Sequence, residues 1–226
     1  MLVGTLSDEG GGCGCSAFIR IKEGHKAGEI FGPVFYGLNS DGTAKLQDLS
    51  GDGTYCNCAD DFKAIGKALP TFLFGFNHAI YKNFHLSFLL RGAIGHAKIN
   101  AYRLFYEGPV IAAFYNIVKT RYYDPSLTNS VYSSHYVENA SFVKLDNISL
   151  TYRIPSRTGI SINFTVQNLF TLTRYTGIDQ EVSYGEPEIK GSTKVIINKS
   201  PLISGLDKRS NYFPSRIFSM GASFIF

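Results

Sequence analysis

The sequence predicts an all-β protein, an antiparallel meander of about seven strands that forms part of a transmembrane β-barrel. Apolar residues alternate with small or polar ones in several segments, long connections alternate with short ones, and no run of 18 apolar residues supplies a membrane helix. The last segment alternates most clearly, with Phe218, Met220, Phe224 and Phe226 on one face. A strand that continues to the last residue is typical of a barrel, in which the final strand must pair with a neighbour.

Three hairpins are predicted before this last strand. Their strands span Ala17 to Ile21 and Ile30 to Leu38, Phe72 to Ile80 and Phe84 to Ile94, and Ile148 to Ile154 and Ile160 to Val166. The third hairpin is the most regular, because apolar and polar residues alternate without interruption in both of its strands. Pro155 and Gly159 mark its turn. Such strands predict a sheet with one polar face in contact with water.

The connections between these strands alternate in length. Short turns follow Ile21, Tyr81 and Pro155, whereas long connections run from Asn39 to Leu69, from Asn100 to Asn139 and from Leu172 to Phe213. This pattern is typical of outer-membrane barrels, which have short periplasmic turns and long extracellular loops. One helix is expected inside a long loop, from Pro109 to Tyr123, where apolar residues recur at helical spacing. That helix would pack on the barrel rim or offer a docking surface to a lid-like partner.

The composition limits the class of protein. The chain has 226 residues, a formal net charge of +4 and 18% charged residues, below the roughly 25% of soluble domains. The charges are spread along the chain, so nucleic acid is not a predicted partner. Met1 to Gly10 lacks the basic and apolar regions of a signal peptide, and an exported protein would therefore begin upstream of this sequence.

A soluble or surface-exposed β-sandwich that binds carbohydrate is the alternative. A sandwich packs the apolar faces of two sheets against each other, whereas a barrel wall turns an apolar band about 25 Å tall toward lipid. In a barrel, aromatic residues near strand ends form girdles at the membrane interfaces. The candidates for such girdles are Tyr81, Phe84, Tyr152 and Tyr175.

Several motifs resemble the SusC/RagA-type TonB-dependent receptors of Bacteroidetes. The segments that carry this resemblance are Tyr136 to Pro155, Gln167 to Gly177, Asp179 to Val182, Gly205 to Asp207 and Tyr212 to Pro214, with Gly66 to Pro70, Tyr81 to Phe84 and Leu89 to Gly92 upstream. The motifs follow the family order and cover nearly the whole chain from about Ile19. One departure is Gln180, where the family more often has Pro.

The resemblance implies that residues 1–226 are the C-terminal part of such a receptor barrel, without the plug domain and the earlier strands. It implies an outer-membrane transporter, not an enzyme, that imports glycans or peptides with energy delivered through TonB. It also implies a SusD-like surface lipoprotein as partner, outer-membrane lipid around the barrel and no cofactor. The terminal strand then looks like the assembly-signal strand that closes the barrel.

The four cysteines form two pairs, Cys13 with Cys15 and Cys56 with Cys58. Both pairs fall in segments expected on the extracellular side, and an even cysteine count in an oxidising compartment favours disulfides. Free thiols and a tetrahedral zinc site are the alternatives, although Cys-x-Cys is tighter than the usual zinc spacing.

The segment from Asp48 to Gly53 resembles the start of a calcium-binding loop. Asp48, Ser50 and Asp52 supply oxygens at the first, third and fifth positions, and Gly53 holds the sixth. The twelfth position is Ala59 instead of Glu, so an Asp- and Gly-rich turn is the simpler interpretation. No residue pattern predicts a catalytic site: the five histidines are scattered, and no Ser/His/Asp set or carboxylate pair shares an element.

Overall fold

The computed structural model describes residues 2–4, 19–20, 24–56, 59–81, 84–108, 116–155, 159–181, 186–190, 194–198, 205–207 and 213–225. Its strands are β1 (Leu2–Gly4), β2 (Ile19–Arg20), β3 (Glu29–Gly32), β4 (Phe35–Leu38), β5 (Ala44–Leu46), β6 (Lys63–Lys67), β7 (Phe72–Tyr81), β8 (Phe84–Ile94), β9 (Ala97–Asn100), β10 (Val137–Asn139), β11 (Phe142–Arg153), β12 (Gly159–Thr173), β13 (Glu186–Lys190), β14 (Lys194–Asn198), β15 (Leu206–Asp207) and β16 (Ile217–Ile225). The described helices are α1 (Ala101–Tyr106) and 3-10 turns at Ala59–Asp61 and Ser134–Tyr136. Among these residues, no helix has the length and apolar character needed to cross a membrane.

The chain forms two compact units. The first comprises residues 1–70, 95–140 and 175–212, and the second comprises residues 71–94, 141–174 and 213–226. We call them the loop unit and the sheet unit, because the first contains the long connections and the second contains the long strands.

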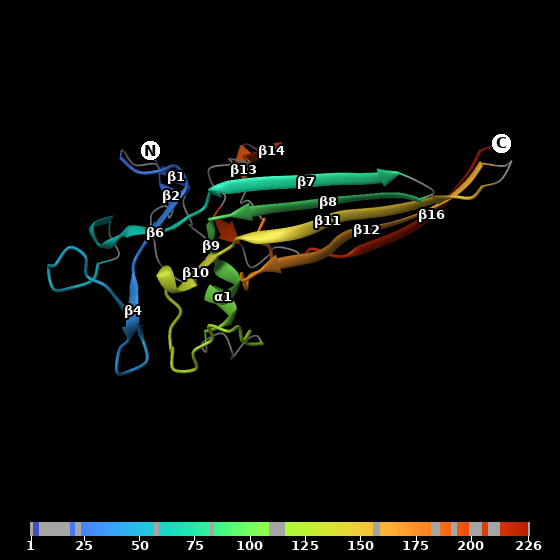
Figure 1. The fold of residues 1–226 in the computed structure, drawn as a ribbon. Helices are drawn as coiled ribbons and strands as arrows, with labels where there is room; N and C mark the ends of the chain where they lie inside the picture. The colour runs from blue at the N-terminus through green and yellow to red at the C-terminus, as the bar shows by residue number, and fades with distance from the viewer. Residues whose placement is uncertain are drawn as a thin grey trace. The chain divides into compact units, whose positions relative to one another are not determined.

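The sheet unit is a five-stranded antiparallel sheet in the order β16-β12-β11-β8-β7, with the strands side by side in Figure 1. The strands are 9 to 15 residues long. A tilted strand needs about 9–11 residues to cross the hydrocarbon core of a bilayer, so all five are long enough. The all-β antiparallel fold expected from the alternating pattern is therefore confirmed.

The strand register gives each face of this sheet its own character. One row across all five strands pairs apolar residues, in the order Ile80, Leu86, Leu150, Phe164 and Met220. The neighbouring row pairs small residues, in the order Ala79, Ser87, Ser149, Thr165 and Ser219. Because successive side chains point to opposite faces, a shift of one residue in any strand would mix these two rows.

A β-bulge lies at the point where two of the strands continue beyond their predicted ends. The register between β11 and its neighbours shifts from Leu145 to Asn147, which leaves Asp146 as an extra residue against β8. Facing this point in β12, Asn168 has a positive φ of 53°. The bulge changes the phase of the alternation, so the uninterrupted pattern predicted a strand beginning only at Ile148, whereas β11 begins at Phe142.

The ends of the sheet differ in their connections. The register places Tyr81 beside His85, Tyr152 beside Phe84 and Gly159 beside Ile225, so the two short connections and the end of β16 share one rim of the sheet. The strand ends that lead into residues 95–140 and 175–212 lie at the opposite rim. This arrangement confirms the predicted alternation of short and long connections for these five strands.

The loop unit consists of small sheets around a compact core. β1, β2, β3 and β6 form one sheet, β10, β9 and β15 form another with β15 parallel to β9, and β4 pairs with β5 and β13 with β14. The core contains Ile30, Ala68, Ile99, Ala101 and Leu206, all almost fully buried. These side chains come from distant parts of the sequence, so the core holds the long connections together.

One prediction about this unit is wrong, and another is tested only in part. The strands of the first hairpin pair antiparallel as predicted, but β2 and β3 belong to a separate sheet of the loop unit and do not continue the five-stranded sheet. Pro33 separates β3 from β4. The meander in the sheet unit therefore has five described strands, where seven were predicted. The predicted helix at Pro109 to Tyr123 lies outside the described residues up to residue 115, and residues 116–123 contain no helix. A separate short helix, α1, was not predicted; it begins at Ala101, where Asn100 caps it by accepting a hydrogen bond from the Arg103 amide.

Candidate functional site

One face of the sheet unit is an exposed apolar surface. Its large side chains are 37% to 79% exposed, with Met220 at the upper limit. The set consists of Phe72, Phe76, Ile80, Phe84, Ile94, Leu150, Ile162, Phe164, Phe170, Leu172, Phe218, Met220 and Phe224. Soluble monomers rarely expose contiguous apolar patches of more than a few hundred Å², so this face is suited to contact with another apolar phase.

The opposite face carries short polar side chains. Ser149 Oγ lies 3.1 Å from Thr165 Oγ1, and Ser161 Oγ lies 2.7 Å from Ser223 Oγ, so hydroxyl groups bond across neighbouring strands. A side chain at Gly221 would collide with Asn163 Oδ1. The middle rows of this face therefore offer hydrogen-bonding groups, whereas Leu73, Tyr81 and Ile217 expose larger side chains near its edges.

The bulge brings three charged side chains together in the sheet unit. Arg91 Nε donates to Asp146 Oδ2 at 2.9 Å and its Nη2 donates to Oδ1 at 3.2 Å, which makes the contact bidentate. Lys144 Nζ lies 3.4 Å from Asp146 Oδ1. The extra residue of the bulge thus supplies the carboxylate that partly neutralises two cations.

Aromatic residues lie at the rim with the short connections. The rings of Phe84 and Tyr152 are stacked at 4.8 Å between centroids, and those of Tyr81 and His85 at 4.2 Å. Phe84 and Tyr152 belong to the apolar face, as expected of girdle residues, whereas Tyr81 pairs with His85 on the opposite face. Tyr175 does not fit that prediction, because it is buried in the loop unit and its hydroxyl donates to Asp207 Oδ2.

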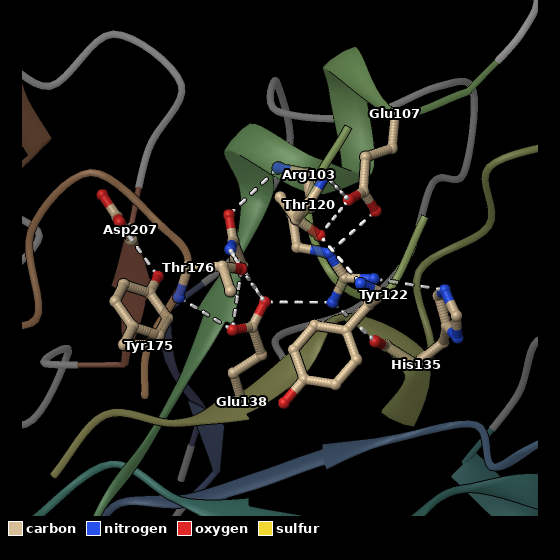
Figure 2. A network of polar contacts seen from close by, with 10 residues as sticks. Arg103, Glu107, Thr120, Tyr122, His135, Glu138, Tyr175, Thr176 and Asp207 are labelled. Atoms are coloured by element: carbon tan, nitrogen blue, oxygen red, sulfur yellow. Dashed lines mark hydrogen bonds and ion pairs between the residues drawn. The ribbon is translucent and has the colours of Figure 1, made fainter. Parts of the chain in front are cut away.

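A buried polar network organises the loop unit around Arg103 (Figure 2). Arg103 is fully buried, its Nε donates to Glu107 Oε2 at 2.8 Å, and its Nη1 donates to Glu138 Oε1 at 3.0 Å. The same guanidinium contacts the carbonyl oxygen and the ring of His135, at 3.2 and 3.3 Å. Burial and the nearby guanidinium lower the pKa of His135.

Further bonds connect this network to three separate chain segments. Glu138 accepts hydrogen bonds from Asn100 Nδ2 and from the amide and hydroxyl of Thr176. Asp207 Oδ2 accepts from the hydroxyl of Tyr175 and from two backbone amides. Burial beside this carboxylate raises the pKa of Tyr175 well above its usual value. The carboxylates of Glu107, Glu138 and Asp207 therefore hold residues 100–138 and 175–207 together.

Lys98 lies buried near a second group of carboxylates in the loop unit. Burial lowers its pKa to about 8, and the nearby Asp207, Asp179 and Glu181 partly oppose that shift. Gln180, the departure from the family pattern, is also buried, and its carbonyl oxygen lies 3.5 Å from His96 Nε2. The sequence analysis did not predict the burial of Gln180.

The predicted loop at Asp48 is organised by its own backbone. Asp48 accepts hydrogen bonds from the amides of Gly51 and Gly53 and from the Ser50 hydroxyl, and Asp52 accepts from the Thr54 amide. The backbone bonds hold the pKa of Asp48 below its usual value. Among the described residues no three His, Cys, Asp or Glu side chains form a metal-binding group. Calcium binding through Asp48, Ser50 and Asp52 remains a prediction.

Only one of the four cysteines, Cys56, lies among the described residues. Cys56 is disulfide-bonded, and its amide donates to Asp61 Oδ2 at 2.6 Å. Cys13, Cys15 and Cys58 lie outside the described residues, so the pairing of the four cysteines remains a prediction.

The predicted terminal strand is β16. It pairs with β12 over nine residues, and Phe218, Met220 and Phe224 lie on the exposed apolar face. Phe226 lies outside the described residues. The role of this strand as an assembly signal remains a prediction.

The comparison with known proteins agrees with this architecture. No protein-family model matches the chain. TonB-dependent receptor P3 of Formosa agariphila is 29% identical over 240 residues, which cover 91% of this chain and 23% of the receptor. TonB-dependent receptor P39 of the same organism is 30% identical over 162 residues. The chain is related to the TonB-dependent receptors. It spans about a quarter of the length of receptor P3, and the resemblance stated from the motifs is confirmed.

Solved structures extend the similarity to the fold. The structure of the RagAB peptide importer in its closed-closed state matches with a TM-score of 0.59 and 22% identity, over 87% of this chain and 23% of that one. A second structure of the RagAB peptide transporter matches with a TM-score of 0.57 and 21% identity. The five-stranded sheet and the loop unit together therefore have the fold of part of a TonB-dependent receptor.

Proposed function

We propose that this chain forms part of the wall of an outer-membrane TonB-dependent transporter. The observation that carries the proposal is the five-stranded sheet, in which every strand is long enough to cross a bilayer and one face is apolar and exposed. Lipid accepts such a face, and the short polar side chains on the other face suit a water-filled or plugged lumen.

The same observation weighs against a soluble β-sandwich. A sandwich would cover the apolar side chains of β12 and β16 with a second sheet, yet Phe164 is 45% exposed and Phe218 is 63% exposed. In the described part of the sheet unit, the apolar row from Ile80 to Met220 is left uncovered. The barrel wall therefore accounts for the exposure, and the sandwich does not.

The transported compound is a glycan, an oligosaccharide or a peptide. The relationship to TonB-dependent receptors supports energised import, and the similarity to a peptide importer supports a large nutrient as cargo. A SusD-like surface lipoprotein is the partner implied by the resemblance, and TonB supplies the energy. No step of this proposal requires catalysis or a cofactor.

Cell fractionation tests the membrane location. We expect the protein in the outer-membrane fraction, released by detergent and not by carbonate washing. Recovery in the periplasm or the medium without detergent would contradict the barrel assignment.

Uptake measurements test the transport role. Cells that carry the protein should accumulate labelled oligosaccharides or peptides too large for porins, and removal of TonB should abolish this accumulation. Removal of the SusD-like lipoprotein should reduce it strongly. Unchanged uptake without TonB would refute energised import while leaving the barrel assignment intact.

A further inference from the structure

A histidine interrupts the apolar face of the sheet unit. His78 lies in β7 between Phe76 and Ile80 on the same face, and all three side chains are exposed. The register places His78 in a row that continues across the sheet through Phe88, Ile148, Val166 and Phe218. The other four members of this row are apolar, so the imidazole departs from the pattern of the face.

His78 lies within the part of β7 that would cross a bilayer. It precedes Tyr81, which ends β7 at the rim with the short connections, by three residues. Three residues span about 10 Å along a strand, which corresponds to about 8 Å of depth at a tilt of about 40°. Ile80 separates His78 from that rim on the same face. The lipid headgroups, which lie outside the hydrocarbon core, are therefore poor hydrogen-bond partners for the imidazole.

The sheet surrounds this imidazole with apolar side chains. The rings of Phe76 and His78 are nearly parallel, with centroids 5.8 Å apart, and the centroid of Phe88 lies 5.9 Å from that of His78. The diagonal neighbours on β8 are Leu86 and Leu90. Within the described residues His78 has these ring contacts and no hydrogen bond. Because a neutral imidazole carries one donor and one acceptor, and unpaired polar groups are costly in lipid, such a residue is expected to have a polar partner.

The edge position of β7 indicates where a partner can come from. In the described part of the sheet, β7 pairs with β8 alone, so its other edge carries no strand. A closed barrel wall has no open edge. A strand on that edge would place one side chain about 4.5–5.5 Å from the Cβ atom of His78, within reach of the imidazole. A charged side chain that faces lipid destabilises a barrel, so a neutral hydroxyl or amide is favoured over a carboxylate or an amine.

We propose that the strand that pairs with the open edge of β7 carries a hydroxyl or amide side chain opposite His78, on the lipid-facing side of the wall, and that this group forms a hydrogen bond with the imidazole. The pair would specify the register at this joint, because a slip of one residue turns the partner to the other face. The inference rests on the proposed barrel wall.

The thermal stability of the folded receptor in outer membranes tests the pair. The measurement is the temperature at which the folded form is lost on gel electrophoresis. H78F should lower this temperature by about 2–4 °C, because it leaves the partner without a hydrogen bond. H78Q keeps a donor and an acceptor and should stay near the unmodified protein. If His78 faced lipid alone, H78F would raise the temperature, because Phe transfers into lipid more favourably; that result would overturn the inference.

An exchange of two rings provides the matched control. H78F/F88H keeps the composition of one cross-strand pair but moves the imidazole to β8, away from the open edge. It should lose as much stability as H78F, and a double variant as stable as the unmodified protein would argue decisively against the pair. Absence of the unmodified protein from the outer membrane would refute the barrel wall itself, whereas a stabilising H78F in a membrane-inserted protein would refute this inference alone.

Photo-crosslinking identifies the partner strand directly. With p-benzoylphenylalanine in place of His78, irradiation of outer membranes should link this position to another strand of the same receptor. Mass spectrometry of the linked peptide should find Ser, Thr, Asn, Gln or Tyr at the position opposite residue 78. Linkage to lipid alone, or to a strand whose lipid-facing residues are all apolar, would overturn the proposal.

Discussion

Replacing Arg103 by Met should destabilise the loop unit more than a substitution at an exposed position of the same unit. The change keeps most of the side-chain volume but removes a fully buried charge between Glu107 and Glu138, whose side chains are only 4% and 3% exposed. Both carboxylates would keep other donors, Thr120 for Glu107 and Asn100 with Thr176 for Glu138. Loss of one partner of a buried ion pair costs about 3–5 kcal/mol.

Pulse proteolysis at increasing urea concentration measures this loss on the chain in detergent. With a slope of about 2 kcal/mol per M, a loss of about 4 kcal/mol lowers the midpoint for cleavage in the loop unit by about 2 M. The control R121M removes an exposed arginine from the same unit and should change the stability by less than about 0.5 kcal/mol. The double variant R103M/E138Q should recover about 1 kcal/mol or more relative to R103M, because contacting residues are coupled. Equal midpoints for R103M and R121M would refute the assignment of Arg103 as the centre of the network.

Three other predictions follow from particular contacts. The pKa of Lys98 is about 8 in the folded chain and 10.5 in the unfolded chain, so the unfolded state binds more protons between these two values. The free energy of unfolding should therefore rise with pH across this range, and K98Q should flatten the rise. An unchanged slope in K98Q would contradict the burial of Lys98. Replacing Gly92 by Ala places a methyl group 2.6 Å from the Phe74 ring and should lower the free energy of unfolding by about 1–3 kcal/mol, as measured in a thermal melt. The same change at Gly75, which has nothing within 4 Å, should lower it less. Equal losses in the two variants would argue against the packing of Phe74. If the cysteines are all paired, thiol titration should detect no reactive thiol before reductant is added and four afterwards; four at the outset would exclude disulfides.

The sequence predicted the sheet unit well because its two faces meet different environments. Wherever one face is apolar and the other polar, alternation identifies the strand directly, as it does for β7, β8 and β16. Alternation failed at Asp146, where the bulge changes its phase, and the start of β11 was missed for that reason.

The loop unit was much less predictable. Its short strands are held by contacts between distant segments, such as Ile30 with Ile99 and Leu206, and these leave no local period. The Arg103 network was missed although Arg103 and Glu107 have the spacing of a helical ion pair. Their third partner, Glu138, lies 35 residues away from Arg103, and only the fold brings it into contact.

The orientation of the sheet toward lipid is tested most directly by tryptophan fluorescence. The chain contains no tryptophan, so a single introduced residue reports on one position without background from this chain. Phe164 and Thr165 are neighbours in β12 and belong to the apolar row and the small-residue row, respectively. In vesicles with brominated acyl chains, the tryptophan of F164W should be strongly quenched and blue-shifted, whereas that of T165W should not be quenched. Equal quenching at both positions, or quenching of T165W alone, would contradict the barrel wall.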